Sequence, residues 1–430
     1  MKPPARKPQK QAPEKKKGFR RFFQILGPGL ITGAGDDDPS GIATYSQAGT
    51  LFGFATLWTA LVTFPLMAAI QEMCARIGFV TSRGLTHTLK EHYPKSILYI
   101  MLLFSIPATV LNIGSDIAGM GEVSHLLLPG IPAWLFSIAM TIILIVVIVR
   151  FPYQKIANIL KWLCLCMLLY IAVPFLLHPD WHKVAVYTFI PHVTWSKDYL
   201  EMLVAILGTT ISPYLFFWQA TMEAEDKQHS KQQIVVNKRV LSDIKQDVGA
   251  GMFASNLVMF FIILTTGAVL HGHITKIDTV EQAAKALEPL AGKLSYALFA
   301  VGIIGTGFLA IPILCGSLSY IISETFGWKM GLDKTFSRAP SFYACIILSL
   351  IVGLCINFIG LSPMKALVYT AILYGITAPV MIAVILHISN NKKIMERRTN
   401  KVISNVLGAL TLLLMTVSAI ALIYFQSTGG

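Results

Sequence analysis

The sequence predicts an all-α integral membrane protein made of two inverted five-helix repeats and an eleventh transmembrane helix. Composition is the first reason: mean hydropathy is +0.64, and 54% of the residues are hydrophobic while only 13% are charged. A soluble protein of this length carries about twice that charged fraction. The second reason is a series of apolar runs of roughly 20 residues, the length of a membrane-crossing helix. The third is a pair of breaks with glycine and proline inside the first and sixth runs.

Eleven apolar runs, separated by charged loops and breaker residues, are each predicted to be one transmembrane span. They lie near residues 22–48, 54–78, 96–127, 133–149, 154–177, 198–222, 247–271, 294–323, 341–359, 364–388 and 402–425. We expect a transmembrane core over 22–390, with repeat 1 at about 22–177 and repeat 2 at about 198–388. A loop and the eleventh span follow over 391–430.

Residues 1–21 are rich in lysine, arginine and proline and have no apolar segment. This composition is typical of a disordered tail and not of a cleaved signal peptide. Positive charges gather on the cytoplasmic side of membrane proteins, so the tail is expected in the cytoplasm. Lysines and arginines are frequent in the predicted inner loops and sparse in the outer ones, and eleven spans then place the C-terminus outside. The net charge of +13 therefore follows topology. We expect a monomer in the lipid bilayer of the cell membrane, with no nucleic-acid partner.

The first span is broken beside three consecutive aspartates, Asp36, Asp37 and Asp38, which precede Pro39. A carboxylate at membrane depth costs about 2.5–3.5 kcal/mol on insertion scales, so it faces a cavity, a partner or an ion. Proline removes a backbone donor, and the broken helix presents carbonyl oxygens beside a negative charge, as in the cation sites of transporters. We expect Asp38 to bind a cation. Asp36 and Asp37 either attract ions, cap a helix or meet a lysine.

The sixth span repeats this break in the second repeat. Its segment 208–214 contains glycine, small hydroxyl residues and Pro213. A proline in a transmembrane helix can be a simple kink. Two broken helices at matching positions of inverted repeats are, however, typical of a substrate site between them.

Other polar residues of the spans have two interpretations each. Asp116 follows Asn112 by one helical turn of span 3, so it either pairs with that amide or faces the cavity. Asn256 in span 7 either lines the cavity or makes an interhelical hydrogen bond. The acidic run at 223–226 is expected to be a solvated face interleaved with lysines, although it could help release cations.

The residues around the first break resemble the NRAMP divalent-metal transporters. The similar signature consists of Gly27-Pro28-Gly29, Asp38-Pro39, Ile42-Ala43-Thr44, Gln47-Ala48-Gly49 and Phe52-Gly53. Through span count and the spacing of both breaks, the resemblance covers nearly the whole chain. It implies a LeuT-type fold and uptake of Mn²⁺ and Fe²⁺, usually with protons, at a site between broken spans 1 and 6. It implies no cofactor, because the metal is the transported ion.

The chain departs from the family pattern at both breaks. The usual Asp-Pro-Gly-Asn reads Asp-Pro-Ser-Gly over 38–41, so the asparagine ligand is replaced by Gly41. The usual Met-Pro-His reads Ser-Pro-Tyr over 212–214. The thioether ligand is thus replaced by Ser212, and the histidine linked to proton movement by Tyr214.

The resemblance extends to span 3, where Asp116 matches an aspartate of the family's proton route. The acid expected three residues later is Gly119. This variant pattern is similar to that of the NRAMP-related magnesium transporters, a branch that carries Mg²⁺ and Mn²⁺ without evident proton coupling. Gly35 and Thr209 stand at the positions of the family's carbonyl ligands.

The chemistry of these replacements favours hard cations. Thioether sulfur selects softer metals, whereas carboxylate, carbonyl, hydroxyl and water suit Mg²⁺ and Mn²⁺, and Mg²⁺ sheds its water reluctantly. Because two ligand side chains are shortened, we expect a wider cavity that holds a partly hydrated ion and an alternating-access cycle without proton coupling. The predicted metal ligands are Asp38, Ser212, Gly35, Thr209 and Gly41. The further candidates for lining the cavity or attracting ions are Asp36, Asp37, Tyr214, Asp116 and Asn256.

Several alternatives remain. One is a proton-coupled Mn²⁺/Fe²⁺ importer of the usual NRAMP type, and another is an organic-cation or amino-acid carrier on the same fold, although Asp38 would repel an amino-acid carboxylate. An enzyme is not expected, because the chain has no HExxH or GxSxG motif. It also has no Walker motif, so an ATP-driven pump is not expected either. The six cysteines lie in apolar segments without CxxC spacing, so we interpret them as small core residues.

Overall fold

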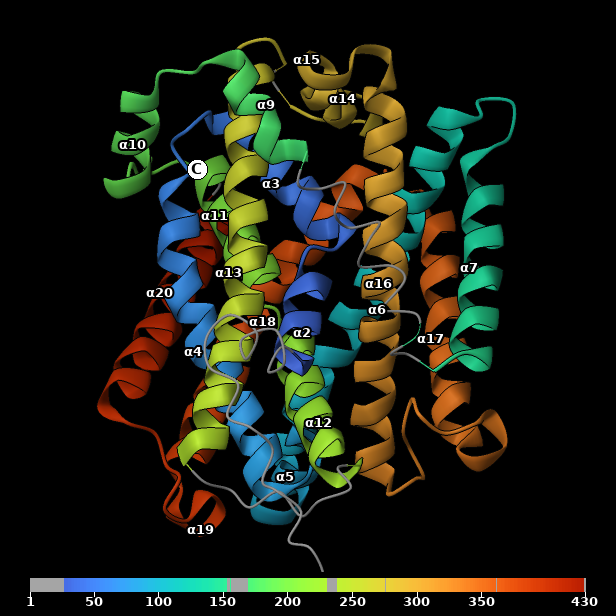
Figure 1. The fold of residues 1–430 in the computed structure, drawn as a ribbon, viewed down its shortest axis with the longest axis vertical. Coiled ribbons are helices and arrows are strands. Elements are labelled where there is room, and N and C mark those ends of the chain that lie inside the picture. Colours follow the sequence, from blue (N-terminus) through green and yellow to red (C-terminus); the bar gives the residue numbers. More distant parts are fainter. Residues whose placement is uncertain are drawn as a thin grey trace, which may run out of the picture.

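The computed structural model describes residues 27–152, 155, 169–229, 238–274, 276–360 and 362–428. The predicted tail at 1–21, the first residues of span 1 and most of span 5 lie outside these residues. In the described part of the chain every regular element is a helix, and the long helices run roughly along one axis (Figure 1).

Helices occupy the positions of the predicted spans. The first half of the chain contains α2 (Pro28–Asp36), α3 (Pro39–Phe52), α4 (Trp58–Thr81), α5 (Leu85–His92), α6 (Lys95–Leu127), α7 (Ala133–Arg150), α9 (Leu169–Leu177), α10 (Trp181–Phe189) and α11 (Lys197–Thr210). The second half contains α12 (Pro213–His229), α13 (Lys238–Val269), α14 (Val280–Ala284), η2 (Lys285–Leu287), α15 (Glu288–Ala291), η3 (Gly292–Leu294), α16 (Ser295–Phe326), η4 (Phe336–Arg338), α17 (Pro340–Ile356), η5 (Asn357–Ile359), α18 (Pro363–Asn390), α19 (Lys392–Met395) and α20 (Val402–Thr428). Among the described residues, eight segments are long and apolar enough to cross a membrane, with α11 and α12 counted together, and α17 is a shorter apolar helix.

Both predicted breaks are present. Helix α2 ends at Asp36 and α3 begins at Pro39, while α11 ends at Thr210 and α12 begins at Pro213. Each second half-helix starts with proline, whose missing N–H costs nothing at a first helical position. Because each run is interrupted, backbone groups at these ends lack intrahelical partners and can bind side chains or ions.

Close backbone contact fixes α2 against α13. A Cβ added to Gly33 would lie 2.3 Å from the carbonyl oxygen of Gly251, and one added to Gly251 would lie 2.1 Å from that of Gly29. Only glycine permits this approach of two membrane helices. The contact holds the first broken helix beside span 7.

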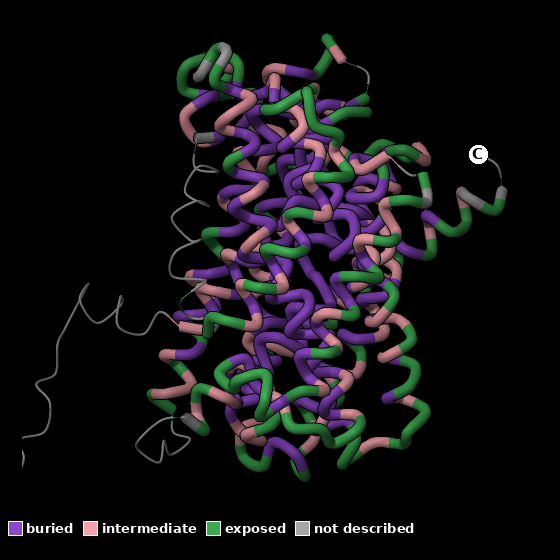
Figure 2. The backbone as a smooth tube through the Cα atoms, turned by 90° about the vertical axis from the view of Figure 1, so that its right-hand side faces the viewer, coloured by how far each residue is buried: buried purple, intermediate pink, exposed green. Residues whose placement is uncertain are grey.

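Buried residues concentrate along the inside of the bundle and exposed ones on its outer faces (Figure 2). The cysteine prediction is wrong in part for this reason. Cys74 and Cys315 are buried, but Cys345 is only partly buried and Cys355 is exposed. An apolar run in a membrane helix has a face toward lipid as well as one toward the core, and α17 presents these two cysteines on its outer side. The remaining two cysteines, Cys164 and Cys166, lie outside the described residues.

Candidate functional site

Asp38 lies at the first break, immediately before α3. Its Oδ1 accepts a hydrogen bond from the backbone N–H of Gly41 at 2.6 Å, and its Oδ2 accepts one from Nδ2 of Asn112 on α6 at 2.8 Å. The residue is only 2% exposed. Both donors are neutral, so the buried carboxylate keeps a negative charge that a cation can complement.

The second break faces this carboxylate across Gly41. A Cβ on Gly41 would lie 3.4 Å from Asp38 Oδ1 and 3.3 Å from Thr209 Oγ1. The Ser212 hydroxyl donates to the carbonyl oxygen of Thr209 at 2.5 Å and lies 3.2 Å from that of Gly208. Since its proton is directed at a backbone carbonyl, the lone pairs of Ser212 Oγ remain able to bind a cation or a water molecule.

The carbonyl of Gly35 is bonded to a side chain of the second break. The Tyr214 hydroxyl donates to Gly35 O at 3.1 Å, and its buried ring lies 5.7 Å from the ring of Tyr374. This bond joins α2 to α12. A cation that uses the Gly35 carbonyl must therefore share it with Tyr214 or displace the hydroxyl.

Asp36 and Asp37 point toward α13. The Ser255 hydroxyl lies 2.6 Å from Asp36 Oδ2 and 3.3 Å from Asp37 Oδ1, and a single hydroxyl proton serves both carboxylates. Asp36 Oδ1 is buried without a hydrogen-bond partner. Among the described residues, these side-chain contacts are with a serine of a neighbouring helix and not with a lysine, and Asp37 stands at the C-terminal cap position of α2.

Pairing with Asn112, one of the two roles considered for Asp116, is not observed. The amide of Asn112 binds Asp38 instead, and both carboxylate oxygens of Asp116 are buried without a hydrogen-bond partner. The break places the Asp38 carboxylate beside α6. The Asn112 amide, one helical turn from Asp116, therefore donates to Asp38. This part of α6 lies close to the start of α3: a Cβ at Gly119, three residues after Asp116, would lie 3.8 Å from Pro39.

Asn256 makes an interhelical contact, the second of its two predicted roles. Thr63 of α4 donates to Asn256 Oδ1 at 2.8 Å, and Asn256 Nδ2 donates to the carbonyl of Met252 at 3.1 Å. Both polar atoms of the side-chain amide are thus occupied by protein groups.

The acidic run after span 6 is not a uniformly solvated face, so that expectation is wrong for its first member. Glu223 is 3% exposed and accepts from Gln219 Nε2 at 3.0 Å. Gln219 Oε1 in turn accepts from the Thr32 hydroxyl of α2 at 2.5 Å. The run begins while α12 is still inside the bundle, where it is linked to the first broken helix.

Asp247 of α13 is a structural residue that the sequence reasoning missed. Its carboxylate accepts from the backbone N–H groups of Gly27, Gly29 and Leu30 at 2.8, 2.7 and 3.2 Å. These are orphan donors at the start of α2, which a carboxylate stabilises well. The sequence does contain a signal for this residue, because Asp247 is an acid at the start of an apolar run. Ser255 carried no such signal.

A pocket of about 130 Å³ opens at one end of the bundle, lined by α3, α11, α18 and the segment before α14. Gln47 of α3 lies in its wall. Gln47 lies nine positions after Asp38, a rise of about 14 Å at 1.5 Å per residue. Over the residues that the structure describes, no group of three or more His, Cys, Asp or Glu side chains could hold a metal ion. A cation at Asp38 would therefore need hydroxyl, carbonyl or water oxygens as its other ligands.

Comparison with known proteins places this geometry in context. The profile of the family described as "Nramp: Natural resistance-associated macrophage protein-like" matches residues 29–425. The "Divalent metal cation transporter MntH" of Caldanaerobacter subterraneus subsp. tengcongensis is 23% identical over 417 residues, covering 96% of this chain and 95% of the relative. The protein of the same name from Clostridium acetobutylicum is 23% identical and is covered over 93% of its length.

Solved structures are similar in fold. A variant of the manganese transporter of Eremococcus coleocola superposes with a TM-score of 0.74 at 17% identity, over 95% of this chain and 88% of that one. Mhp1, a nucleobase-cation-symport-1 family transporter, superposes with a TM-score of 0.56 at 12% identity, over 94% and 93%. At these identities the likeness shows the fold alone. The prediction of an all-helical membrane protein with a LeuT-type fold is confirmed.

Proposed function

This chain belongs to the Nramp family, and on that premise we propose that it carries divalent metal cations across a membrane, with Mn²⁺ as a transported ion. The family is one of transporters, so an intramembrane enzyme is no longer an alternative. The observation that carries the proposal is the meeting of Asp38, Thr209 and Ser212 between two broken helices, with Gly41 lining the space between them. A buried carboxylate beside hydroxyl and carbonyl oxygens suits a hard divalent cation.

The transport step requires the site to face the two sides of the membrane in turn. Asp38 is nearly inaccessible in this structure, while a pocket lies beside Gln47, farther along α3. The hydrogen bond from Tyr214 to Gly35 links the half-helices that flank both breaks. Movement of α2 and α12 together would therefore open the site at the opposite end.

Mn²⁺ is supported by the relatives, since those named above are a "Divalent metal cation transporter" and a "manganese transporter". Mg²⁺ is a second candidate, and it is favoured by one feature of this chain. Ser212 offers a hydroxyl and Gly41 offers no side chain where the family has a thioether and an amide. This leaves only oxygen donors, which Mg²⁺ prefers. Assignment to the magnesium-transporting branch stays a prediction.

The two candidates also differ in proton coupling. Histidine is the side chain best suited to exchange protons near neutral pH, and Tyr214 occupies that position here and donates its proton to Gly35. Asp116, however, keeps a buried carboxylate beside the first break. The relatives support the hypothesis of a Mn²⁺ importer of the usual proton-coupled type. The residues Ser212, Gly41 and Tyr214 support the hypothesis of uncoupled Mg²⁺ and Mn²⁺ transport.

A flux assay in proteoliposomes separates these possibilities. Uptake of Mn²⁺, Mg²⁺, Ca²⁺ and Fe²⁺ is measured together with the fluorescence of a pH dye inside the vesicles. Divalent metal transport predicts Mn²⁺ uptake above protein-free vesicles. Metal-dependent acidification would identify a proton symporter, whereas Mg²⁺ and Mn²⁺ uptake at constant internal pH would support the uncoupled candidate. Failure to carry any of the four ions in a folded protein would refute the proposal.

A further inference from the structure

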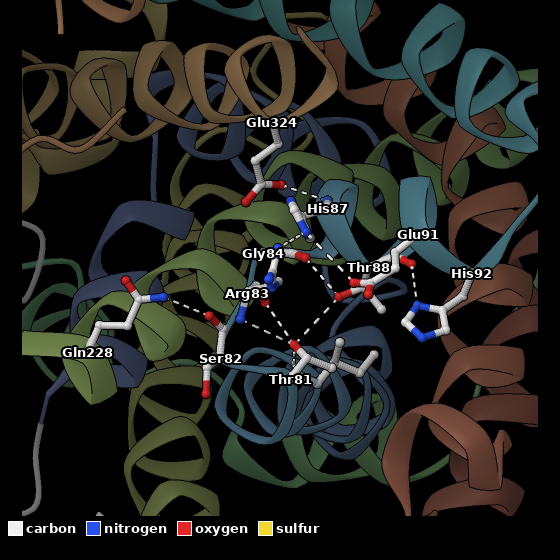
Figure 3. Close-up of polar contacts among 11 residues, drawn as sticks. Thr81, Ser82, Arg83, Gly84, His87, Thr88, Glu91, His92, Gln228 and Glu324 are labelled. Atoms are coloured by element: carbon white, nitrogen blue, oxygen red, sulfur yellow. Dashed lines mark hydrogen bonds and ion pairs between the residues drawn. The ribbon is translucent and has the colours of Figure 1, made fainter. Parts of the chain in front are cut away.

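Glu324 lies near the end of α16, far from the first break in the sequence. Its side chain is buried and caps the start of α5. It is 4% exposed, and its Oε2 accepts from the backbone N–H of His87 at 3.0 Å (Figure 3). Gly84 precedes α5, and His87 is the third residue of that helix. The carboxylate therefore occupies the place of an N-cap and complements the positive end of the helix dipole. A Cβ on Gly84 would lie 2.1 Å from Glu324 Oε1, so the close approach requires glycine.

Helix α5 closes one end of the bundle. It packs against α4, α6, α12 and α16, at the end opposite the short helices α14 and α15 (Figure 1). Leu85 and Leu89 are fully buried in one apolar cluster with Phe216 and Phe217 of α12. The second half-helix of the broken span 6 is thus covered at this end by α5.

The segment that connects α5 to α4 can act as a joint. Lys227 Nζ of α12 donates to the carbonyl of Phe79 at 2.7 Å, and Gln228 Nε2 donates to that of Ser82 at 2.7 Å (Figure 3). The end of α4 is thereby tied to α12. Ser82 adopts a left-handed φ of 57°, and the chain turns there toward Gly84 and α5. The joint lies between a helix bonded to α12 and a helix held on α16.

In the part of the chain that the structure describes, few polar bonds hold α5 on α16. Besides the Glu324 cap, Lys90 Nζ donates to the carbonyl of Thr325 at 2.7 Å, and Lys90 is exposed to solvent. A surface contact of this kind contributes little. The buried carboxylate is therefore the main polar attachment of α5 to α16 among the described residues, and its loss would weaken the hold on α5 and leave the apolar packing of Leu85 and Leu89.

We propose that Glu324 is a positioning residue for transport, which holds α5 on α16 while this end of the bundle is closed and releases it when the end opens. The inference rests on the proposed function, because a transporter that alternates must open at both ends. It assigns the second gate to α5, while the pocket beside Gln47 marks the first. Under the predicted topology this end is the cytoplasmic one.

The direct test measures whether α5 leaves the bundle. Leu89→Cys in a cysteine-free background provides a buried reporter on α5, labelled with a water-soluble maleimide. Glu324→Gln preserves the shape of the side chain but removes its charge, and Glu91→Gln makes the same change at an exposed position of α5. We expect Glu324→Gln to raise the labelling rate about five- to tenfold, the factor by which a charge-assisted hydrogen bond exceeds a neutral one. Glu91→Gln should leave the rate unchanged.

A second reporter separates release of α5 from general loosening. In a second background, Cys74 of α4 is kept as the single cysteine; it is buried in the same apolar cluster as Leu89, and we expect its labelling to stay slow in Glu324→Gln. Equal labelling of the Leu89→Cys reporter in all variants, or a parallel increase at Cys74, would overturn the proposal. Labelling needs no transported ion, so failure of the proposed function and failure of this inference are distinguishable.

The kinetics of Mn²⁺ transport distinguish a positioning role of Glu324 from a purely structural one. If Glu324→Gln opens the α5 end, a smaller fraction of molecules offers the site at the pocket end, and KM for Mn²⁺ supplied there rises by the factor by which that fraction falls. The maximal rate should be retained. A lower maximal rate with unchanged KM would instead indicate loss of folded protein and contradict the positioning role.

Discussion

At the scale of single residues, the site is defined by which oxygen atoms are already bonded. The carbonyls of Gly35 and Thr209 receive the hydroxyls of Tyr214 and Ser212, so neither carbonyl is bare in this structure. A cation must compete with these bonds or use the hydroxyl lone pairs. Because a net hydrogen bond is worth about 0.5–1.5 kcal/mol, the competition is weak enough for a divalent ion to win.

The Tyr214→Phe variant tests this competition. Without the hydroxyl, the Gly35 carbonyl is free for the cation or its water, and we expect KM for Mn²⁺ to fall about two- to tenfold, the equivalent of one net hydrogen bond. Tyr374→Phe is the matched control, since Tyr374 is the neighbouring buried ring and the hydroxyl that bonds the Gly35 carbonyl is that of Tyr214. An unchanged or raised KM in Tyr214→Phe would mean that the Gly35 carbonyl does not take part in binding.

Ligand softness at the breaks gives a second residue-scale prediction. The double variant Ser212→Met with Gly41→Asn adds a thioether and an amide, and we expect its transport ratio of Cd²⁺ to Mg²⁺ to rise at least about tenfold, because sulfur prefers softer metals. Ion competition in proteoliposomes measures the ratio. The single variants are the controls, since a Cβ at Gly41 already lies within 3.4 Å of Asp38 Oδ1 and 3.3 Å of Thr209 Oγ1. A parental ratio in a functional double variant would rule out softness as the selecting property.

At the scale of elements, the broken helices are held by caps and by glycine contacts. Asp247 satisfies the first donors of α2, and Gly29 and Gly33 lie directly against the backbone of Gly251. Such contacts fix where α2 ends, and with it the position of Asp38. A small displacement of α2 would move the carboxylate away from Thr209.

Two glycines of α13 offer a matched comparison. An added Cβ at Gly251 meets backbone atoms of α2 at 2.1 Å, whereas one at Gly249 meets nothing within 4 Å. We expect Gly251→Ala to lower the thermal unfolding temperature and destabilise the protein by about 1–3 kcal/mol, the usual cost of overpacking. Gly249→Ala should be neutral or stabilising, since alanine favours helix by about 1 kcal/mol over glycine. Equal melting temperatures for the two variants would show that the α2–α13 contact is not tight.

At the scale of the whole molecule, the membrane topology determines which end of the bundle faces the cytoplasm. The charge distribution predicts that the loop between spans 3 and 4 lies outside and that the segment after span 10 lies inside. Cysteines substituted at the exposed positions Gly130 and Lys393 test this in intact cells, in a cysteine-free background. An impermeant maleimide should label Gly130→Cys at once and Lys393→Cys only after permeabilisation. The reverse pattern would invert the orientation, and with it the assignment of the α5 end to the cytoplasm.

Much of the fold could be read from the sequence because membrane helices are encoded locally. Apolar run length located spans such as 54–78 and 96–127, which correspond to α4 and α6, and Pro39 and Pro213 located both breaks. Partner choice could not be read in this way. Asn112 lies 74 residues from Asp38, and Glu324 lies 237 from His87. Which donor a buried carboxylate meets depends on how helices cross, and no local pattern contains that information.

The central claim is that divalent cations cross the membrane through the space beside Asp38, and Mn²⁺ uptake by proteoliposomes tests it most directly. Wild type is compared with Asp38→Ala and with Glu288→Gln, a change at an exposed acid of α15, each at equal amounts of folded protein. We predict that wild type and Glu288→Gln take up Mn²⁺ well above protein-free vesicles. Uptake by Asp38→Ala should fall at least about a hundredfold, because removing a direct charged ligand costs about 3 kcal/mol or more. Wild-type uptake by a correctly folded Asp38→Ala protein would contradict the account.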